Sequence, residues 1–200
     1  MVFEESDFKI FDVTSLAGRM TLIKDVIDPK FEQSAATILP ILNKNWQQWY
    51  AHVAKHLRRT TYAPDNTWVA FAPNKRGYKM MPHFELGIWA DHVYFYLAVE
   101  ENMKPKETTV IVDKMMLVSD MVAKLPREFV LSVDHMVNVS TPLTLPTYDV
   151  AVQRFSDTKH SEVLIGIKLL LGDKHFKTAT DLSQITDALA LLLPIYNKLK

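Results

Sequence analysis

Alternating positions in the middle of the chain predict a pair of β-strands. Over residues 92–99, one set of alternate residues is entirely apolar and the other is aromatic or small. Because neither face of this strand is strongly polar, we expect it to be central in a sheet rather than at an edge. Residues 83–89 would form the preceding strand, joined to it by a hairpin at Ala90–Asp91. Short apolar or β-branched runs predict further strands over residues 67–72, 129–133 and 163–171.

Apolar residues spaced by three or four positions predict helices at both ends of the chain and in its middle. The first helical stripe covers residues 16–27 and should stop at Asp28–Pro29. The same pair can start a second helix over residues 28–42, with aspartate as the cap and proline in the first turn. Pro40 should bend or end that helix. Further helical stripes cover residues 105–125, 148–155 and 182–196, the last with a bend expected near Pro194.

Strands gather in the middle of the chain and do not alternate strictly with helices. This order favours a two-layer α+β domain, a mostly antiparallel sheet packed by helices, over a doubly wound parallel sheet. A chain of 200 residues without repeats or a flexible linker is the size of one domain, so we expect a single domain over residues 1–200.

Composition excludes several classes of chemistry. The chain has no cysteine, which rules out disulfides, thiolate zinc sites, iron–sulfur clusters and a cysteine nucleophile. The N-terminal MVFEESDF is acidic and does not resemble a signal peptide. The densest apolar run, residues 188–196, is shorter than the roughly 20 residues of a membrane span. We therefore expect a cytoplasmic protein that does not associate with membranes.

Basic residues are concentrated between His52 and His83. This block holds six Lys/Arg and one acid, although the whole chain has a net charge of zero. One cluster contains Arg58 and Arg59, and a second, in a predicted turn, contains Arg76 and Lys79. Guanidinium groups bind phosphate and carboxylate in a bidentate manner, which indicates an anion-binding surface. The alternative is that these are ordinary solvated charges.

The identity of such an anion is open. Aromatic residues interleaved with the basic ones suit a nucleotide or RNA, but zero net charge argues against a dedicated nucleic-acid binder. The chain lacks the glycine-rich phosphate motifs GxxxxGK[ST] and GxGxxG and the nucleophile motif GxSxG. The sequence predicts no cofactor, and it does not predict an oligomeric state.

Two histidines in the basic block have a spacing found in metal sites. His52 and His56 are four residues apart, as in HExxH zinc proteins, but Val53 stands where that motif needs glutamate. In an extended segment the two histidines would still share a face. His83 could join them only if the fold returns it to the same place. We therefore favour hydrogen-bonded histidines and predict no metal site.

Three further ionisable residues are candidates for ligand binding or catalysis. Asp134 and His135 follow a predicted strand, where such a pair can act as acid and base or simply form a turn. Glu85 interrupts an apolar strand. It could face a pocket and pair with Arg76 or His83, or it could lie on the solvent face of the sheet.

Several segments resemble a known family. The runs HVAKHLRRT, PDNTWVAF and RGYKMMPHFELGIW, the N-terminal FKIF and LAGRM, and Asp134–His135 are similar to the YktB-like family of uncharacterised bacterial proteins. This resemblance implies a single-domain cytosolic α+β protein with a topology similar to biotin-ligase and class II synthetase catalytic domains. It implies no activity, so no catalytic residue is transferred, and NKRGYKM only weakly matches the biotin-ligase nucleotide loop.

Three functional hypotheses remain. The first is a binding protein for an anionic ligand, and it predicts that the two basic clusters meet in one pocket. The second is a transferase-like or ligase-like enzyme with His83, Glu85, Asp134 or His135 beside that pocket. The third is a structural or protein-interaction role, with Arg58 and Arg59 in ion pairs and an exposed apolar patch near Trp46 and Trp49.

Overall fold

One antiparallel sheet forms the centre of the molecule. The computed structural model describes residues 3–45, 47–172 and 181–200. Within them the strand order is β1-β2-β3-β4-β7-β5-β6, and every neighbouring pair is antiparallel. The strands are β1 (Tyr50–Val53), β2 (Thr67–Ala72), β3 (His83–Ile88), β4 (His92–Val99), β5 (Val130–Ser132), β6 (Thr141–Pro142) and β7 (Val163–Leu170). This confirms the predicted single α+β domain.

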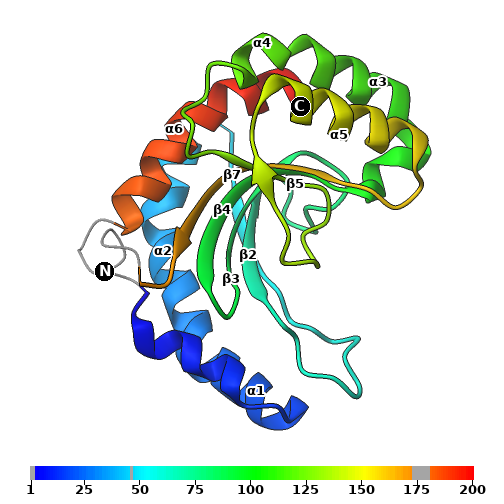
Figure 1. Ribbon diagram of the computed structural model, residues 1–200. Helices are drawn as coiled ribbons and strands as arrows, with labels where there is room; N and C mark the ends of the chain where they lie inside the picture. The colour runs from blue at the N-terminus through cyan, green and yellow to red at the C-terminus, as the bar shows by residue number, and fades with distance from the viewer. Residues whose placement is uncertain (1–2, 46, 173–180) are drawn as a thin grey trace.

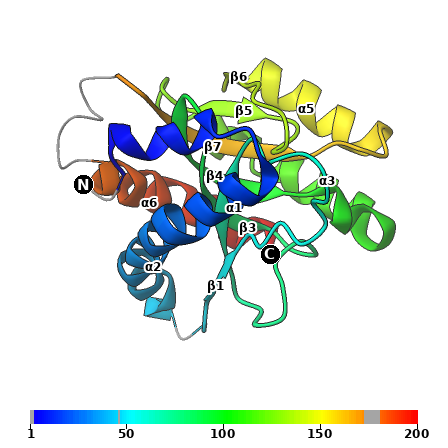
Figure 2. The same cartoon turned by 90° about the horizontal axis from the view of Figure 1, so that it is seen from below.

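The helices pack on one face of the sheet. Figure 1 shows α2 and α6 side by side along the sheet, with α3, α4 and α5 grouped at its other end, and Figure 2 shows the same two groups from below. Their apolar residues join those of the strands in one large core. The helices are α1 (Leu16–Leu22), α2 (Asp28–Leu42), α3 (Lys104–Leu117), α4 (Ser119–Val122), α5 (Leu145–Asp157) and α6 (Asp181–Leu199). None of the described helices is both long and apolar enough to span a membrane.

The two faces of the sheet have different compositions. In β4 the apolar set of alternate residues lies in the helix-covered core, and Tyr94, Tyr96 and Ala98 lie on the other face, as the alternation predicts. All eight residues of β4 are buried, which confirms a central strand. The second face also contains two fully buried ionisable residues, His83 and Glu85. Side chains from loops, among them Ala54 and Tyr78, pack against this second face.

The chain does not stop being helical at Asp28–Pro29, so that prediction is wrong. A short π-helical segment, Ile23–Ile27, connects α1 to α2. The Asp28 N–H bonds to the carbonyl of Ile23, five residues back. Because proline cannot donate a backbone hydrogen bond and crowds the preceding turn, the wider π turn allows the helix to continue past Pro29. Pro40 lies inside α2, which ends two residues later.

Other element boundaries differ modestly from the predictions. The helix expected over residues 105–125 divides at Val118, and α5 extends beyond residues 148–155 at both ends. Neither β1 nor β6 was predicted. Gly172, two residues after the end of β7, has a φ of +87°, a left-handed conformation that glycine adopts without steric cost.

Candidate functional site

Strand register brings three carboxylates to one end of the polar face. The alternation of β3 places His83 and Glu85 on this face, opposite the buried Phe84. Glu100 directly follows β4 and is two residues from Ala98, which is on the same face. Because Val99 pairs with Val163 in β7, the next step of the antiparallel register sets Glu100 opposite Glu162.

His83, Glu85 and Glu100 form the deepest part of the site. His83 Nδ1 donates to the Met81 carbonyl at 2.9 Å, so its Nε2 points the other way. Nε2 lies 3.2 Å from Glu85 Oε1 and 3.5 Å from Glu100 Oε1. All three side chains are at most 1% exposed. Buried charges of this kind are stable only when paired.

Two further side chains hold Glu100. Lys79 Nζ and Asn102 Nδ2 each donate to Glu100 Oε2 at 3.0 Å. Lys79 comes from the loop between β2 and β3, which folds back over the polar face. In the same loop, the Tyr78 ring packs on His83 with centroids 4.8 Å apart, and its hydroxyl accepts a hydrogen bond from Trp68.

His135 and Glu162 form a second buried pair. His135 Nδ1 donates to Glu162 Oε2 at 2.7 Å, and its backbone N–H donates to the same oxygen at 2.9 Å. The amide of Asn66 donates to the His135 carbonyl at 2.9 Å and so ties the loop to the sheet. The ring packs edge-on against Trp68 at 5.1 Å. These contacts fix the ring with Nε2 as its remaining polar atom.

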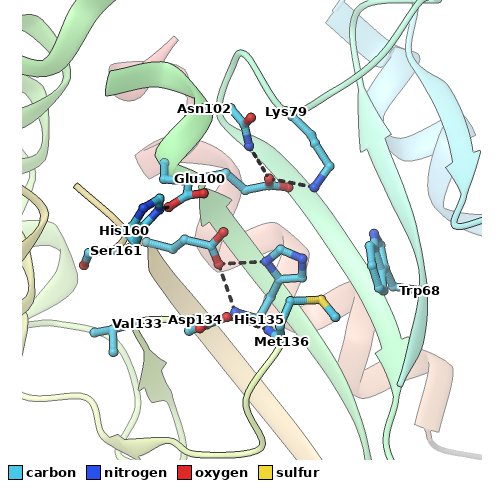
Figure 3. Close-up of a pocket in the computed structure, with 12 residues that line it drawn as sticks. Trp68, Lys79, Glu100, Asn102, Val133, Asp134, His135, Met136, His160 and Ser161 are labelled. Atoms are coloured by element: carbon cyan, nitrogen blue, oxygen red, sulfur yellow. Dashed lines mark hydrogen bonds and ion pairs between the residues drawn. The ribbon is translucent and has the colours of Figure 1, made fainter. Parts of the chain in front are cut away.

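Part of this cluster lines an open cavity of about 390 Å³. Glu100 lies at the cavity at the end of β4, and Lys79 and His135 reach it from two loops, as Figure 3 shows. Glu162 also lines the cavity. Asp134, Glu101, Asn102 and His160 also line it. His83 and Glu85 do not line the cavity. They lie behind Glu100, which lines it and is 3.5 Å from His83 Nε2.

Burial and neighbouring charges shift several pKa values. Burial opposes the charged form of His135, but the hydrogen bond that it donates to Glu162 and the nearby carboxylates outweigh burial and raise the pKa of His135 to about 9. Burial likewise opposes the charged forms of His83 and Glu85, but the hydrogen bond and the opposite charges between them outweigh it, which raises the pKa of His83 and lowers that of Glu85. Burial and the charge of Glu85 raise the pKa of Glu100. His135 is therefore protonated at neutral pH, and the raised pKa of His83 favours its protonated form.

The chain aligns with a bacterial protein family over almost its whole length. A family model described as "Domain of unknown function (DUF1054)" matches residues 3–196. The chain belongs to this family. UPF0637 proteins of Leuconostoc citreum and Leuconostoc mesenteroides are 58% and 59% identical to it, with 100% of both chains covered. A UPF0637 protein of Lactiplantibacillus plantarum is 43% identical over 98% of this chain and 94% of its own. The resemblance to an uncharacterised bacterial family is thus confirmed; the similarity to biotin-ligase catalytic domains remains a prediction.

The structure of this DUF1054 member brings five of the sequence-predicted site residues together. Lys79, His83, Glu85 and His135 form the buried cluster or touch it, and Asp134 is at the cavity rim. Glu85 pairs with His83, as the sequence suggested, and faces the interior rather than solvent.

His52 and His56 lie outside this cavity. His52 is in β1 and its Nε2 bonds to the Asn74 carbonyl at 2.9 Å, and His56 follows the strand at φ +48° and bonds to Thr67 at 3.0 Å. The segment is not helical. Burial and the charge of Arg59 lower the pKa of His56 to about 4, so the ring is neutral.

The arginines of the basic block do not line the cavity. Arg58 and Arg76 are exposed and Arg59 is half-buried. Neither Arg58 nor Arg59 forms an ion pair with any described residue, although the structural hypothesis predicted this. Trp49, expected in an exposed patch, is buried, and Trp46 lies outside the described residues.

Sequence reasoning missed Glu100, Glu162 and Asn102. A signal for the two glutamates was present. Each adjoins an eight-residue apolar strand and continues the set of alternate residues that lies on the polar face of the sheet. Recognising that they meet required the β4–β7 pairing, which joins segments about 60 residues apart.

The pKa of His135 predicts a pH-dependent stability. The folded value of about 9 lies above the ordinary 6.5, so the folded state binds more protons than the unfolded state between these pH values. The contribution of His135 to stability should be fully present below pH 6.5 and be lost, by on the order of 3 kcal/mol, as pH rises to about 9. Urea unfolding across this range would measure the slope. His135→Gln should flatten it, and an equal slope in that variant would contradict the assignment.

Proposed function

We propose that the protein binds a small anionic molecule, bearing a carboxylate or phosphate, in the 390 Å³ cavity. The supporting observation is a set of three groups that converge there and retain hydrogen-bond donors with no acceptor among the described residues. The Lys79 ammonium has three protons and the Asn102 amide two, and Glu100 accepts only one from each. His135 Nε2 is the third donor, because the ring is protonated and Glu162 holds only Nδ1.

The cavity dimensions and walls favour a small ligand over a nucleic acid. Its volume lies within the range of small-molecule sites, roughly 300–1,000 Å³. Trp68, the aromatic residue of the cavity wall, is only 7% exposed and has His56 and His135 packed against it. It is therefore not available as a stacking platform for a base. We propose accordingly that RNA is not the partner, and that the protein, which has no cysteine, acts in the cytoplasm.

Two lysines of the same loop provide a matched test. Lys79 lines the cavity, whereas Lys75 is exposed and does not. Isothermal titration calorimetry with inorganic phosphate, succinate and AMP should reveal at least one binder. Lys79→Gln should weaken it about 10- to 100-fold, the usual effect of losing a charge-assisted hydrogen bond. Lys75→Gln should leave affinity unchanged.

Two outcomes would count against this proposal. One is that none of these anions binds to the wild-type protein. The other is equal weakening in Lys79→Gln and Lys75→Gln, which would show only general electrostatic attraction to the basic block.

The His135–Glu162 pair also favours a second candidate function, acid–base catalysis by a transferase-like or ligase-like enzyme. A carboxylate on Nδ1 orients the ring and leaves Nε2 facing the cavity, which is the arrangement of a general acid. The two functions separate experimentally: His135→Gln would abolish turnover but only weaken binding if the residue is catalytic.

A further inference from the structure

The innermost group of ionisable residues has more acceptors than donors. His83 Nε2 faces Glu85 Oε1 and Glu100 Oε1, yet its single proton can make only one direct hydrogen bond. Glu85 Oε2 and Glu100 Oε1 have no hydrogen-bond partner in the described structure, and both atoms are buried. Unsatisfied carboxylate oxygens in a fully buried position are costly, which indicates that a cation belongs between them.

The separations of these atoms match those of ligands around one metal ion. Metal–nitrogen and metal–oxygen bonds of about 2.1 Å place neighbouring ligand atoms roughly 3.0–3.4 Å apart in octahedral or tetrahedral geometry. The observed distances from His83 Nε2 are 3.2 Å to Glu85 Oε1 and 3.5 Å to Glu100 Oε1. One ligand atom from each of the three residues lies within 4.8 Å of the others.

The surroundings also have the features of a metal site. A metal-bound histidine usually donates its other N–H to a carbonyl or carboxylate, and His83 Nδ1 donates to the Met81 carbonyl. Ligating carboxylates are commonly held by hydrogen bonds on the remaining oxygen, and Lys79 and Asn102 hold Glu100 Oε2 in this way. Glu100 Oε1, the atom nearer His83, is left without such a partner.

We propose that His83 Nε2, Glu85 and Glu100 bind one divalent transition-metal ion. The ion takes the place of the Nε2 proton, which passes to solvent, and two carboxylates neutralise its charge. A mixed imidazole and carboxylate set suits Zn²⁺, Fe²⁺ or Mn²⁺. Three protein ligands leave open coordination positions, and because Glu100 lines the cavity these positions are on the cavity side.

A neighbouring set, Glu100, His135 and Glu162, also lies within 4.8 Å but is less suitable. Glu162 Oε2 already accepts two hydrogen bonds from His135, and His135 Nδ1 is used in one of them. The ion is therefore assigned to the first set, with Glu162 outside its coordination sphere. This inference does not depend on the anion-binding proposal, because it concerns the binding of a metal ion alone.

Two adjacent glutamates provide a matched pair of variants. Glu100 is buried in the proposed site, whereas Glu101 is more exposed and pairs with His160 at 2.9 Å. Metal-free protein would be titrated with Zn²⁺ by calorimetry and with Mn²⁺ by electron paramagnetic resonance. We expect one ion per chain in the wild type, in Glu101→Gln and in Glu162→Gln, and loss of the ion in Glu100→Gln and His83→Gln.

A measurement on the wild type keeps the test decisive if a variant fails to fold. Bound Mn²⁺ should show hyperfine coupling to an imidazole nitrogen, as expected from His83 Nε2 as a ligand. No bound ion at concentrations where surface carboxylates stay empty would overturn the proposal. So would bound Mn²⁺ without nitrogen coupling, or binding that Glu100→Gln and Glu101→Gln reduce equally.

Discussion

Glu85→Gln should destabilise the metal-free protein by about 3–5 kcal/mol, the usual cost of removing one partner from a buried ion pair. The substitution preserves the size of the side chain but removes the charge that stabilises the His83 imidazolium 3.2 Å away. Glu100, at 3.5 Å, can compensate only in part because its other oxygen is shared with Lys79. Guanidinium unfolding monitored by circular dichroism at pH 7 would measure the loss.

An exposed glutamate and a double variant complete this experiment. Glu128 is exposed, and Glu128→Gln should change stability by less than about 0.5 kcal/mol. Combining Glu85→Gln with His83→Gln removes both members of the pair, so the double variant should lose less than the sum of the single losses. If Glu85→Gln behaves like Glu128→Gln, then His83 is not a buried cation and the electrostatic description of the cluster is wrong.

The central strands could be predicted because their pattern is local. In residues 92–99 neither set of alternate residues is strongly polar, which indicates that both faces of β4 are covered. This pattern can be recognised from neighbouring residues alone. By contrast, β1 has four residues of mixed character, and its extended form depends on pairing with β2. The continuity of the helix across Pro29 depends on a π turn that residue preferences do not indicate.

The site was predictable only in part, for a similar physical reason. His83, Glu85 and His135 are conspicuous as polar residues within or directly after apolar strands. Their partners Glu100 and Glu162 become meaningful only when β4 and β7 are known to pair. The density of positive charge directed attention to Arg58 and Arg76, yet exposed arginines are solvated by water and need no partner. Buried partners, which charge counting does not detect, distinguish Lys79 and His135 from them: Lys79 pairs with Glu100, and His135 with Glu162.

The same β4–β7 pairing predicts a severe effect for Gly166→Ala. A Cβ at this position would lie 1.9 Å from the Phe95 backbone carbonyl and 2.8 Å from the Tyr96 ring. A backbone oxygen in the middle of a sheet cannot move aside as a flexible side chain can, so the strands must separate. We expect a loss of at least about 4 kcal/mol, in the exceptional range for a single substitution. Because whole domains have only about 5–15 kcal/mol of stability, thermal unfolding should show a large decrease in Tm or an unfolded protein.

Two other glycines show whether the effect arises from the backbone contact. At Gly87 an added Cβ would meet the side chain of Tyr94 at 2.2 Å, whereas at Gly77 it would meet nothing within 4 Å. Gly77→Ala should therefore be nearly neutral, and Gly87→Ala should be intermediate because the ring can shift at a cost of about 1–3 kcal/mol. If Gly166→Ala is no worse than Gly87→Ala, β4 and β7 are not held as closely as described. The placement of Glu100 opposite Glu162, which depends on that pairing, would then fail with it.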